Sequence, residues 1–345
     1  MTKYHELKAT LETVQWGYLD RDVKPALTID SGDIVLLESL SHHAGDAPDL
    51  MMDEAIKEIY DHVEERGPGV HIVTGPIEVK GAEPGDVLAV KVLDLQPRLL
   101  YGSNFQASWG QLVEEFDQKE MVTIYKADPD TGWATAVFTY EYPENEPDAE
   151  TKPGKITDPS SVERKETLKD VRIPMRLHFG TSGVGRKEAG KFDSIPPGYF
   201  GGNVDNRNFN IGTTMYYPIH VKGAMYYAGD SHFAQGDGEL NGTAIEAHVN
   251  GLLEISLEKK LILANNPLLE TPKYWVVHGF NEDLDLATRE AANEAVAFLT
   301  NNKGLTREEA YSLLSVAGDF HISQVVDGVK GVHCRIRKDL FAPAE

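Results

Sequence analysis

Cysteine is nearly absent from this chain of 345 residues, in which Cys334 is the single one. A lone cysteine excludes a disulfide within the chain and is typical of cytoplasmic proteins, so we expect a cytoplasmic protein. Cys334 lies in the strand-like stretch GVHCRIR, and we interpret it as a core residue rather than a nucleophile.

Basic residues are also few, with 33 Lys and Arg against 55 Asp and Glu and a formal net charge of −22. Because phosphate binding depends on clustered Lys and Arg, neither nucleic acid nor an anionic membrane is expected as a partner. No apolar run approaches the roughly 20 residues of a membrane span. The first residues, MTKYHELKATLET, lack the apolar centre of a signal peptide. We therefore expect a soluble globular protein.

Two familiar catalytic signatures are missing as well. The chain contains no GxSxG nucleophile elbow and no HExxH zinc motif. Its chemistry is therefore sought in a less familiar cluster of polar residues.

The most informative stretch is GDSHFAQGDGELNGTAIEAH, at residues 229–248. Its first half holds one imidazole, one amide and three carboxylates, at Asp230, His232, Gln235, Asp237 and Glu239. Carboxylates packed so closely repel one another unless a cation lies among them or one of them keeps a proton. The stretch predicts a metal-dependent or carboxylate-driven hydrolytic site, and the alternative is a solvated acidic loop.

Two other regions offer partners for this cluster. His42 and His43 follow a predicted strand, and we expect only one of them to point inward because side chains alternate on extended backbone. In PPGYFGGNVDNR, at residues 196–207, Asn203 and Asp205 are two positions apart and can face one pocket. Imidazole with carboxylate ligands suits Zn²⁺, whereas carboxylates alone suit Ca²⁺ or Mn²⁺.

Strand signals dominate the first 280 residues. Gly32-Asp33 precedes the apolar run IVLLES, and Pro84-Gly85-Asp86 precedes VLAVKVLDL. Further strand-like runs lie at 121–125, 134–140, 171–179 and 274–280.

Helical periodicity is clear at residues 51–66 and 285–302, and Thr306 with Glu309 predicts a capping box that opens a further short helix. The segment 142–169 is rich in Pro, Glu, Asp and Lys and is interpreted as a surface insertion.

One internal repeat stands out. PIEVKGA, at residues 76–82, recurs as PIHVKGA at 218–224, and each copy is followed shortly by Gly-Asp. Either the similarity is a coincidence of two short segments, or a β-hairpin unit is duplicated in a pseudo-symmetric β core.

The chain resembles the acetamidase/formamidase family of amide hydrolases along nearly its whole length. The matching blocks lie at residues 75–94, 196–207, 218–246 and 310–341. The resemblance implies hydrolysis of a small amide to a carboxylate and ammonia in the cytoplasm. It also implies a homodimer or higher homo-oligomer and a divalent metal, usually zinc.

Together these observations predict a mainly β fold, and the resemblance implies a β-sandwich-type core with α/β elements. We expect residues 1–260 to form the catalytic core, and residues 261–345 to form an α+β segment packed on it within the same domain.

Each candidate residue receives a hypothetical role. We assign the metal to Asp230, His232, Asp205 and either His42 or His43, and the proton shuttle to Glu239, with Asp237 as the second choice. Asn203 and Gln235 are assigned to orienting the amide and stabilising the oxyanion. The alternative function is a non-catalytic β-sandwich protein that binds a divalent cation or a small polar ligand.

Overall fold

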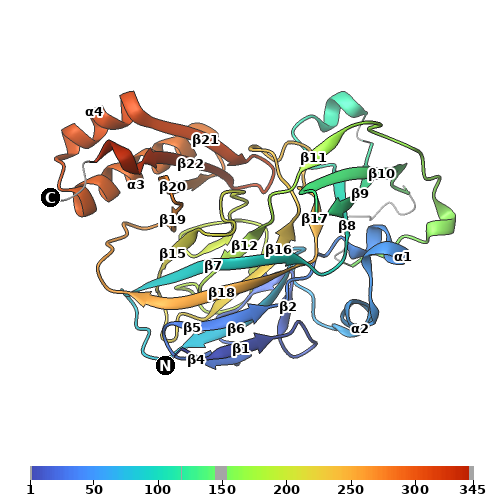
Figure 1. Cartoon of the computed structure of the whole chain (residues 1–345), viewed down its shortest axis with the longest axis horizontal. Coiled ribbons are helices and arrows are strands. Elements are labelled where there is room, and N and C mark those ends of the chain that lie inside the picture. The colour runs from blue at the N-terminus through green and yellow to red at the C-terminus, as the bar shows by residue number, and fades with distance from the viewer. Residues whose placement is uncertain (1, 118, 144–153, 342–345) are drawn as a thin grey trace.

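The computed structural model describes residues 2–117, 119–143 and 154–341. It confirms a mainly β fold with a C-terminal α+β segment (Figure 1). Within the described ranges the strands form one nine-stranded sheet, one eleven-stranded sheet and a two-stranded pair. No helix of these ranges is long and apolar enough to cross a membrane.

The nine-stranded sheet combines strands from both ends of the chain. Its spatial order is β1 (Tyr4–Leu7), β5 (Asp33–Leu37), β18 (Val249–Glu258), β7 (Val87–Pro97), β15 (Thr214–Pro218), β19 (Leu268–Glu270), β20 (Tyr274–Asn281), β22 (Lys330–Arg337) and β21 (Gly318–Gln324). Because β15 pairs with β19, the sheet runs without a break across the predicted boundary at residue 260. The division of the chain at that residue stays a prediction.

The eleven-stranded sheet carries the residues of the acidic cluster. Its main path is β11 (Arg172–Pro174), β10 (Trp133–Glu141), β9 (Met121–Asp128), β8 (Tyr101–Gln106), β17 (Glu246–Ala247), β16 (Tyr226–His232), β12 (His178–Gly183) and β14 (Gly201–Asn203). A branch joins it where β6 (Ile72–Val79) pairs with β16, and β6 in turn pairs with β2 (Val14–Trp16) and β4 (Leu27–Ile29). The separate pair is β3 (Tyr18–Leu19) with β13 (Phe192–Asp193).

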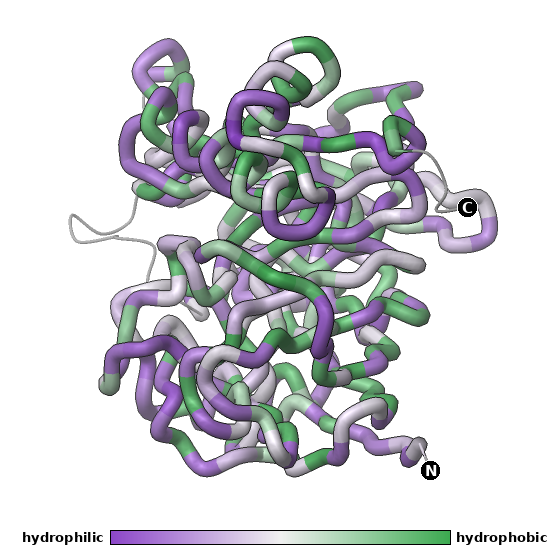
Figure 2. The backbone as a smooth tube through the Cα atoms, turned by 90° about the vertical axis from the view of Figure 1, so that its left-hand side faces the viewer, coloured by the Kyte–Doolittle hydropathy of each residue, from purple (hydrophilic) through white to green (hydrophobic). Residues whose placement is uncertain are grey.

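The two large sheets share one hydrophobic core. Val35 and Val90 of the nine-stranded sheet belong to the same buried cluster as Val73 and Phe179 of the other sheet. At Gly251 an added Cβ would lie 2.6 Å from the Phe179 ring, so the sheets approach closely there. Hydrophobic and hydrophilic residues alternate along much of the chain (Figure 2). This alternation matches strands that bury one face, and each fully buried Val or Phe contributes about 1.5–3 kcal/mol.

The sequence repeat connects the sheets instead of forming two hairpins. The first copy runs from β6 to β7, and the second runs from β15 to β16. The strands pair crosswise, β6 with β16 and β7 with β15. Gly81 and Gly223, with φ of 78° and 79°, occupy the matching turn positions. Each turn therefore carries the chain from one sheet into the other, and the predicted pseudo-symmetry stays a prediction.

The C-terminal helices lie at one end of the nine-stranded sheet. The helix α3 (Leu284–Lys303) packs against β20 and β22, and Gly304 ends it in the left-handed conformation. Thr306 and Glu309 form the predicted capping box at the start of α4 (Arg307–Ala317). Cys334 is buried in the core beneath these helices, and burial raises the pKa of its thiol to about 12. The expected core role of this cysteine is confirmed.

Two predicted elements differ in extent from the structure. The helix predicted over 51–66 is divided into α1 (Pro48–Met51) and α2 (Glu54–His62). The division occurs because the Asp53 side chain accepts a hydrogen bond from the Ile56 N–H and starts a new helix. The strand-like run 171–179 is likewise divided between β11 and β12.

The predicted surface insertion at 142–169 lies partly outside the described residues. Its described part contacts the core, because Tyr142 is buried and the Thr157 N–H donates to the Gly45 carbonyl at 2.9 Å. Its role as an insertion stays a prediction.

Candidate active site

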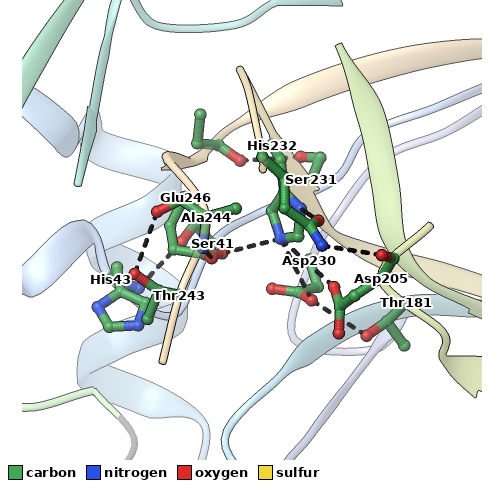
Figure 3. A network of polar contacts seen from close by, with 12 residues as sticks. Ser41, His43, Thr181, Asp205, Asp230, Ser231, His232, Thr243, Ala244 and Glu246 are labelled. Carbon is green, nitrogen blue, oxygen red and sulfur yellow. Dashed lines mark hydrogen bonds and ion pairs between the residues drawn. The ribbon is translucent and has the colours of Figure 1, made fainter. Parts of the chain in front are cut away.

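A cavity of about 410 Å³ opens beside the ends of β14 and β16. Its polar lining comes from segments far apart in the sequence, at His42, His43, His71, Asp193, Asn203, Asp205, Asp230, Glu239, Thr243, Glu246 and Asp327. Asp205, Asp230 and His232 point toward one another beside it (Figure 3).

Asp230 stands at the centre of this group. Its Oδ2 lies 3.5 Å from His232 Nε2 and 3.7 Å from His71 Nε2, and it accepts a hydrogen bond of 3.2 Å from Thr181 Oγ1. Burial alone raises a carboxyl pKa, but the neighbouring His71 and His232 outweigh it and hold the pKa of Asp230 well below its usual range. These neighbours therefore favour the ionised form of Asp230.

A second histidine, His178, contacts the Nδ1 side of the His232 ring. His178 Nδ1 donates to the Arg176 carbonyl at 2.7 Å, and burial with the neighbouring His232 lowers the pKa of His178 to about 3. His178 is therefore neutral, and its Nε2 lies 3.0 Å from both His232 Nδ1 and Gln235 Oε1. Gln235 Oε1 also lies 3.2 Å from His232 Nδ1, so the hydrogen on this nitrogen is shared between the two acceptors. This leaves His232 Nε2 facing the carboxylates.

The other face of His232 meets three carboxylates. Its Nε2 lies 3.2 Å from Glu246 Oε2, 3.5 Å from Asp230 Oδ2 and 4.0 Å from Asp205 Oδ1. These side chains are all buried. Burial lowers the pKa of His232, but Glu246 and Asp230 outweigh that effect and raise it well above its usual value. A positive charge is therefore strongly favoured at this point.

Two further carboxyl groups behave in the opposite way to Asp230. Burial and the Asp230 charge raise the pKa of Asp205, while burial, Asp205 and Asp327 raise that of Glu239 well above its usual range. Groups whose environments separate their pKa values in this manner are suited to acid and base roles in one site.

Three site carboxylates have left-handed backbone conformations. The φ angles are 49° at Asp205, 50° at Asp230 and 49° at Glu239. Such angles are uncommon for residues other than glycine, and they cluster at functional sites where the surrounding fold holds them in place.

The donor atoms fit a divalent metal ion. Within the described residues, buried atoms without a hydrogen-bond partner include His232 Nε2, Asp205 Oδ1, Glu246 Oε2 and His42 Nδ1. Three overlapping groups each bring their ligand atoms within 4.8 Å of one another, and they are His42 with His71 and Asp230, Asp230 with His232 and Glu246, and Asp205 with His232 and Glu239. Mixed imidazole and carboxylate donors suit Zn²⁺ among the common ions.

The structure brings most of the predicted site residues together. His42, His43, Asn203, Asp205, Asp230 and Glu239 line the cavity, while His232 and Gln235 support it as described above. Asp237 lies apart from this cavity, since its Oδ1 is 2.8 Å from Arg207 Nε and its Oδ2 is 3.6 Å from His321 Nδ1. We therefore leave Asp237 out of the proton transfer proposed below.

Both His42 and His43 line the cavity, contrary to the expectation that only one points inward. The alternation rule does not apply because the two residues form a turn before a short 3₁₀ helix, Ala44–Asp46. His43 Nδ1 lies 2.9 Å from Asp46 Oδ2, which also accepts a hydrogen bond of 2.6 Å from Ser103 Oγ. His42 belongs to one of the possible metal-binding groups, and His43 does not.

Sequence reasoning missed four residues of the site. Glu246 lies in the stretch 229–248, and Asp327 lies in the C-terminal block 310–341, so both were within segments already singled out. His71 directly precedes β6 and His178 begins β12, and no local pattern marks either as functional.

Gly180 leaves the space in which the site is assembled. A Cβ added there would lie 2.5 Å from Asp205 Oδ1, 2.5 Å from His232 Cε1 and 2.7 Å from Asp230 Oδ2. If the expected amide hydrolysis occurs at this site, Gly180→Ala should lower it at least about 100-fold, because displacements near 1 Å have effects of that size. Gly236→Ala is the matched control, since nothing lies within 4 Å of its added Cβ. Equal activity of the two variants in an ammonia assay, with unchanged circular dichroism, would contradict this packing.

Comparison with known proteins identifies the family. A family model described as the acetamidase/formamidase family matches residues 9–189 and 174–341. This chain belongs to the acetamidase/formamidase family. Its membership makes it an amide hydrolase and confirms the resemblance found in the sequence.

Individual relatives agree with this membership. The chain is 31% identical over 300 residues to an acetamidase of Mycolicibacterium smegmatis, covering 72% of this chain and 73% of that protein. It is 26% identical over 308 residues to a formamidase of Methylophilus methylotrophus, covering 75% and 74%. The crystal structure of an acetamidase from Bacillus halodurans has the same fold, with a TM-score of 0.74 over 97% of this chain and 98% of that one, at 24% identity.

Proposed function

We propose that this family member hydrolyses the C–N bond of a small linear amide to a carboxylate and ammonia with a bound divalent metal ion. The observation that supports it best is the meeting of three potential metal-binding groups around Asp230 and His232. Zinc is the metal that we propose first, and calcium or manganese are the alternatives.

The metal ligands proposed are Asp230, His232 and Asp205, with His42 completing the set from the facing turn. His71 and Glu246 lie close enough to take part as well. A metal ion held there would polarise the amide carbonyl and lower the pKa of bound water from 15.7 to about 7.

Glu239 is proposed to carry the proton. Amide hydrolysis requires a base that takes a proton from water and an acid that returns it to the departing nitrogen. One carboxyl group performs both steps best when its pKa lies near the working pH. Burial and the nearby Asp205 and Asp327 raise the pKa of Glu239 above its usual range, toward the working pH. The Glu239 side chain also lines the cavity.

Asn203 is proposed to orient the amide. Its Oδ1 lies 2.8 Å from Thr181 Oγ1, closer than the 3.2 Å between that hydroxyl and Asp230 Oδ2, so the single hydroxyl hydrogen is shared by the two acceptors. This contact fixes the side-chain amide and leaves its NH₂ group to donate to a substrate carbonyl or oxyanion in the cavity. Gln235 is proposed to act indirectly, by positioning Asp205, because its Nε2 donates to the Asp205 backbone carbonyl at 2.8 Å.

An ammonia-release screen with purified protein tests this function. We expect release from acetamide, formamide or a close relative of these amides. Release from none of them, by protein that still binds zinc, would instead support the alternative of a protein that only binds a cation or a small polar ligand.

Location and assembly belong to the same proposal. A single buried cysteine supports a cytoplasmic protein. A homodimer or a larger homo-oligomer is proposed from the family resemblance alone.

A further inference from the structure

Part of the cavity lining has no use in the chemistry proposed above. Five apolar side chains line it together with the carboxylates, and they are Val70, Trp109, Ile195, Pro196 and Val326. Val326 is buried and the other four are partly exposed. Neither metal binding nor proton transfer requires an apolar surface of this kind.

The cavity is also large for the smallest amides. Its volume of about 410 Å³ lies within the roughly 300–1,000 Å³ of sites that bind ligands much larger than these amides. Acetamide has only four non-hydrogen atoms, and formamide has three. Either amide would leave most of the apolar lining in contact with water.

Trp109 is held in place before any substrate binds. Its Nε1 donates to the Gly242 carbonyl at 3.2 Å, and its ring stacks on buried Phe105 at a centroid distance of 5.9 Å. Phe105 in turn contacts the His43 ring, with centroids 5.7 Å apart. The indole is therefore a fixed wall between the aromatic cluster and the polar end of the cavity, and binding against it requires little ordering.

We propose that the site binds primary amides whose acyl group is apolar and larger than acetyl, with the acyl chain packed against Trp109. This inference rests on the proposed function, because it places the carbonyl group at the carboxylates and the acyl chain on the apolar lining. Val70, Ile195 and Val326 complete the surface that the chain contacts.

The series acetamide, propionamide and butyramide tests this preference. Each buried methylene contributes about 0.8 kcal/mol, which is about a fourfold gain in kcat/KM. We therefore expect kcat/KM for butyramide to exceed that for acetamide by about 15-fold. Values of kcat/KM that stay constant or fall from acetamide to butyramide would overturn this inference while leaving amide hydrolysis intact. Absence of ammonia release from every amide would contradict the proposed function itself.

Variants of Trp109 test its role in that preference. We expect Trp109→Ala to reduce the butyramide to acetamide ratio of kcat/KM to below about 3, because the methylenes lose their apolar contact. Trp109→Phe should keep most of the ratio.

The matched control is Trp133→Ala in β10. The Trp133 ring packs under Arg172 instead of lining the cavity, so the ratio of this variant should equal that of the unaltered chain. An unchanged ratio in Trp109→Ala, with equal losses on every amide, would show a merely structural role and overturn the assignment.

Discussion

Asp230→Asn is expected to lower kcat/KM for amide hydrolysis by about 10²–10³, because losing one partner of a buried charge pair costs about 2–5 kcal/mol of binding, here of the proposed ion. Asp230 belongs to two of the potential metal-binding groups, and its carboxylate is the one that His71 and His232 keep ionised. A neutral amide at this position cannot balance a cation. Metal content per chain, measured after dialysis, should fall together with activity.

Asp237→Asn is the matched control for that experiment. Asp237 lies seven positions further along the same stretch, but it pairs with Arg207 outside the cavity. Because Asp237 belongs to a separate possible metal-binding group with His321 and His333, the expectation concerns the ion at Asp230 alone, which the variant should keep together with nearly all of the activity. If Asp237→Asn loses activity as strongly as Asp230→Asn, the placement of the catalytic cavity is wrong.

Glu239→Gln is expected to lower kcat by about 10²–10⁴ without loss of metal, the range for removal of a general acid or base. The glutamine keeps the size of the side chain but can no longer accept a proton from water. Single-turnover ammonia release and metal analysis on the same sample separate these two effects.

The metal analysis decides the role of Glu239. Full turnover by Glu239→Gln would reject the proposed proton transfer. A variant that loses metal and activity together would identify Glu239 as a ligand, as its membership in the group with Asp205 and His232 allows.

The elements that sequence reasoning predicts best are those with local causes. Thr306 and Glu309 specify their capping box within four residues, and the apolar run that follows Gly32-Asp33 forms β5 as predicted. The helix over 51–66 was predicted too long because Asp53 was not recognised as an N-cap.

The sequence indicates where the candidate site lies, but which residues take part in it depends on how the strands pair. The stretch 229–248 contributes Asp230, His232, Glu239 and Glu246 because β16 and β17 pair next to each other. His71 joins them because β6 pairs with β16, and no local pattern reveals such a pairing. Asp237 shows the reverse case, in which proximity in the sequence does not lead to a shared cavity.

The protonation of each carboxyl group depends on the fold and was beyond a sequence-based prediction. Asp205, Asp230 and Glu239 are chemically similar, and only their neighbours distinguish them. His71 and His232 keep Asp230 ionised, whereas burial and nearby carboxylates favour a proton on Glu239. The sequence contains the groups, but the distances between them arise from the fold.

Removal and return of the metal is the most direct test of the central claim. The purified chain is treated with a chelator, and ammonia release is measured before and after zinc, calcium or manganese is added back. We expect activity to fall at least about 100-fold on chelation, because the proposed nucleophile depends on the ion, and zinc to restore it. Undiminished ammonia release from protein shown to contain no metal would contradict the account.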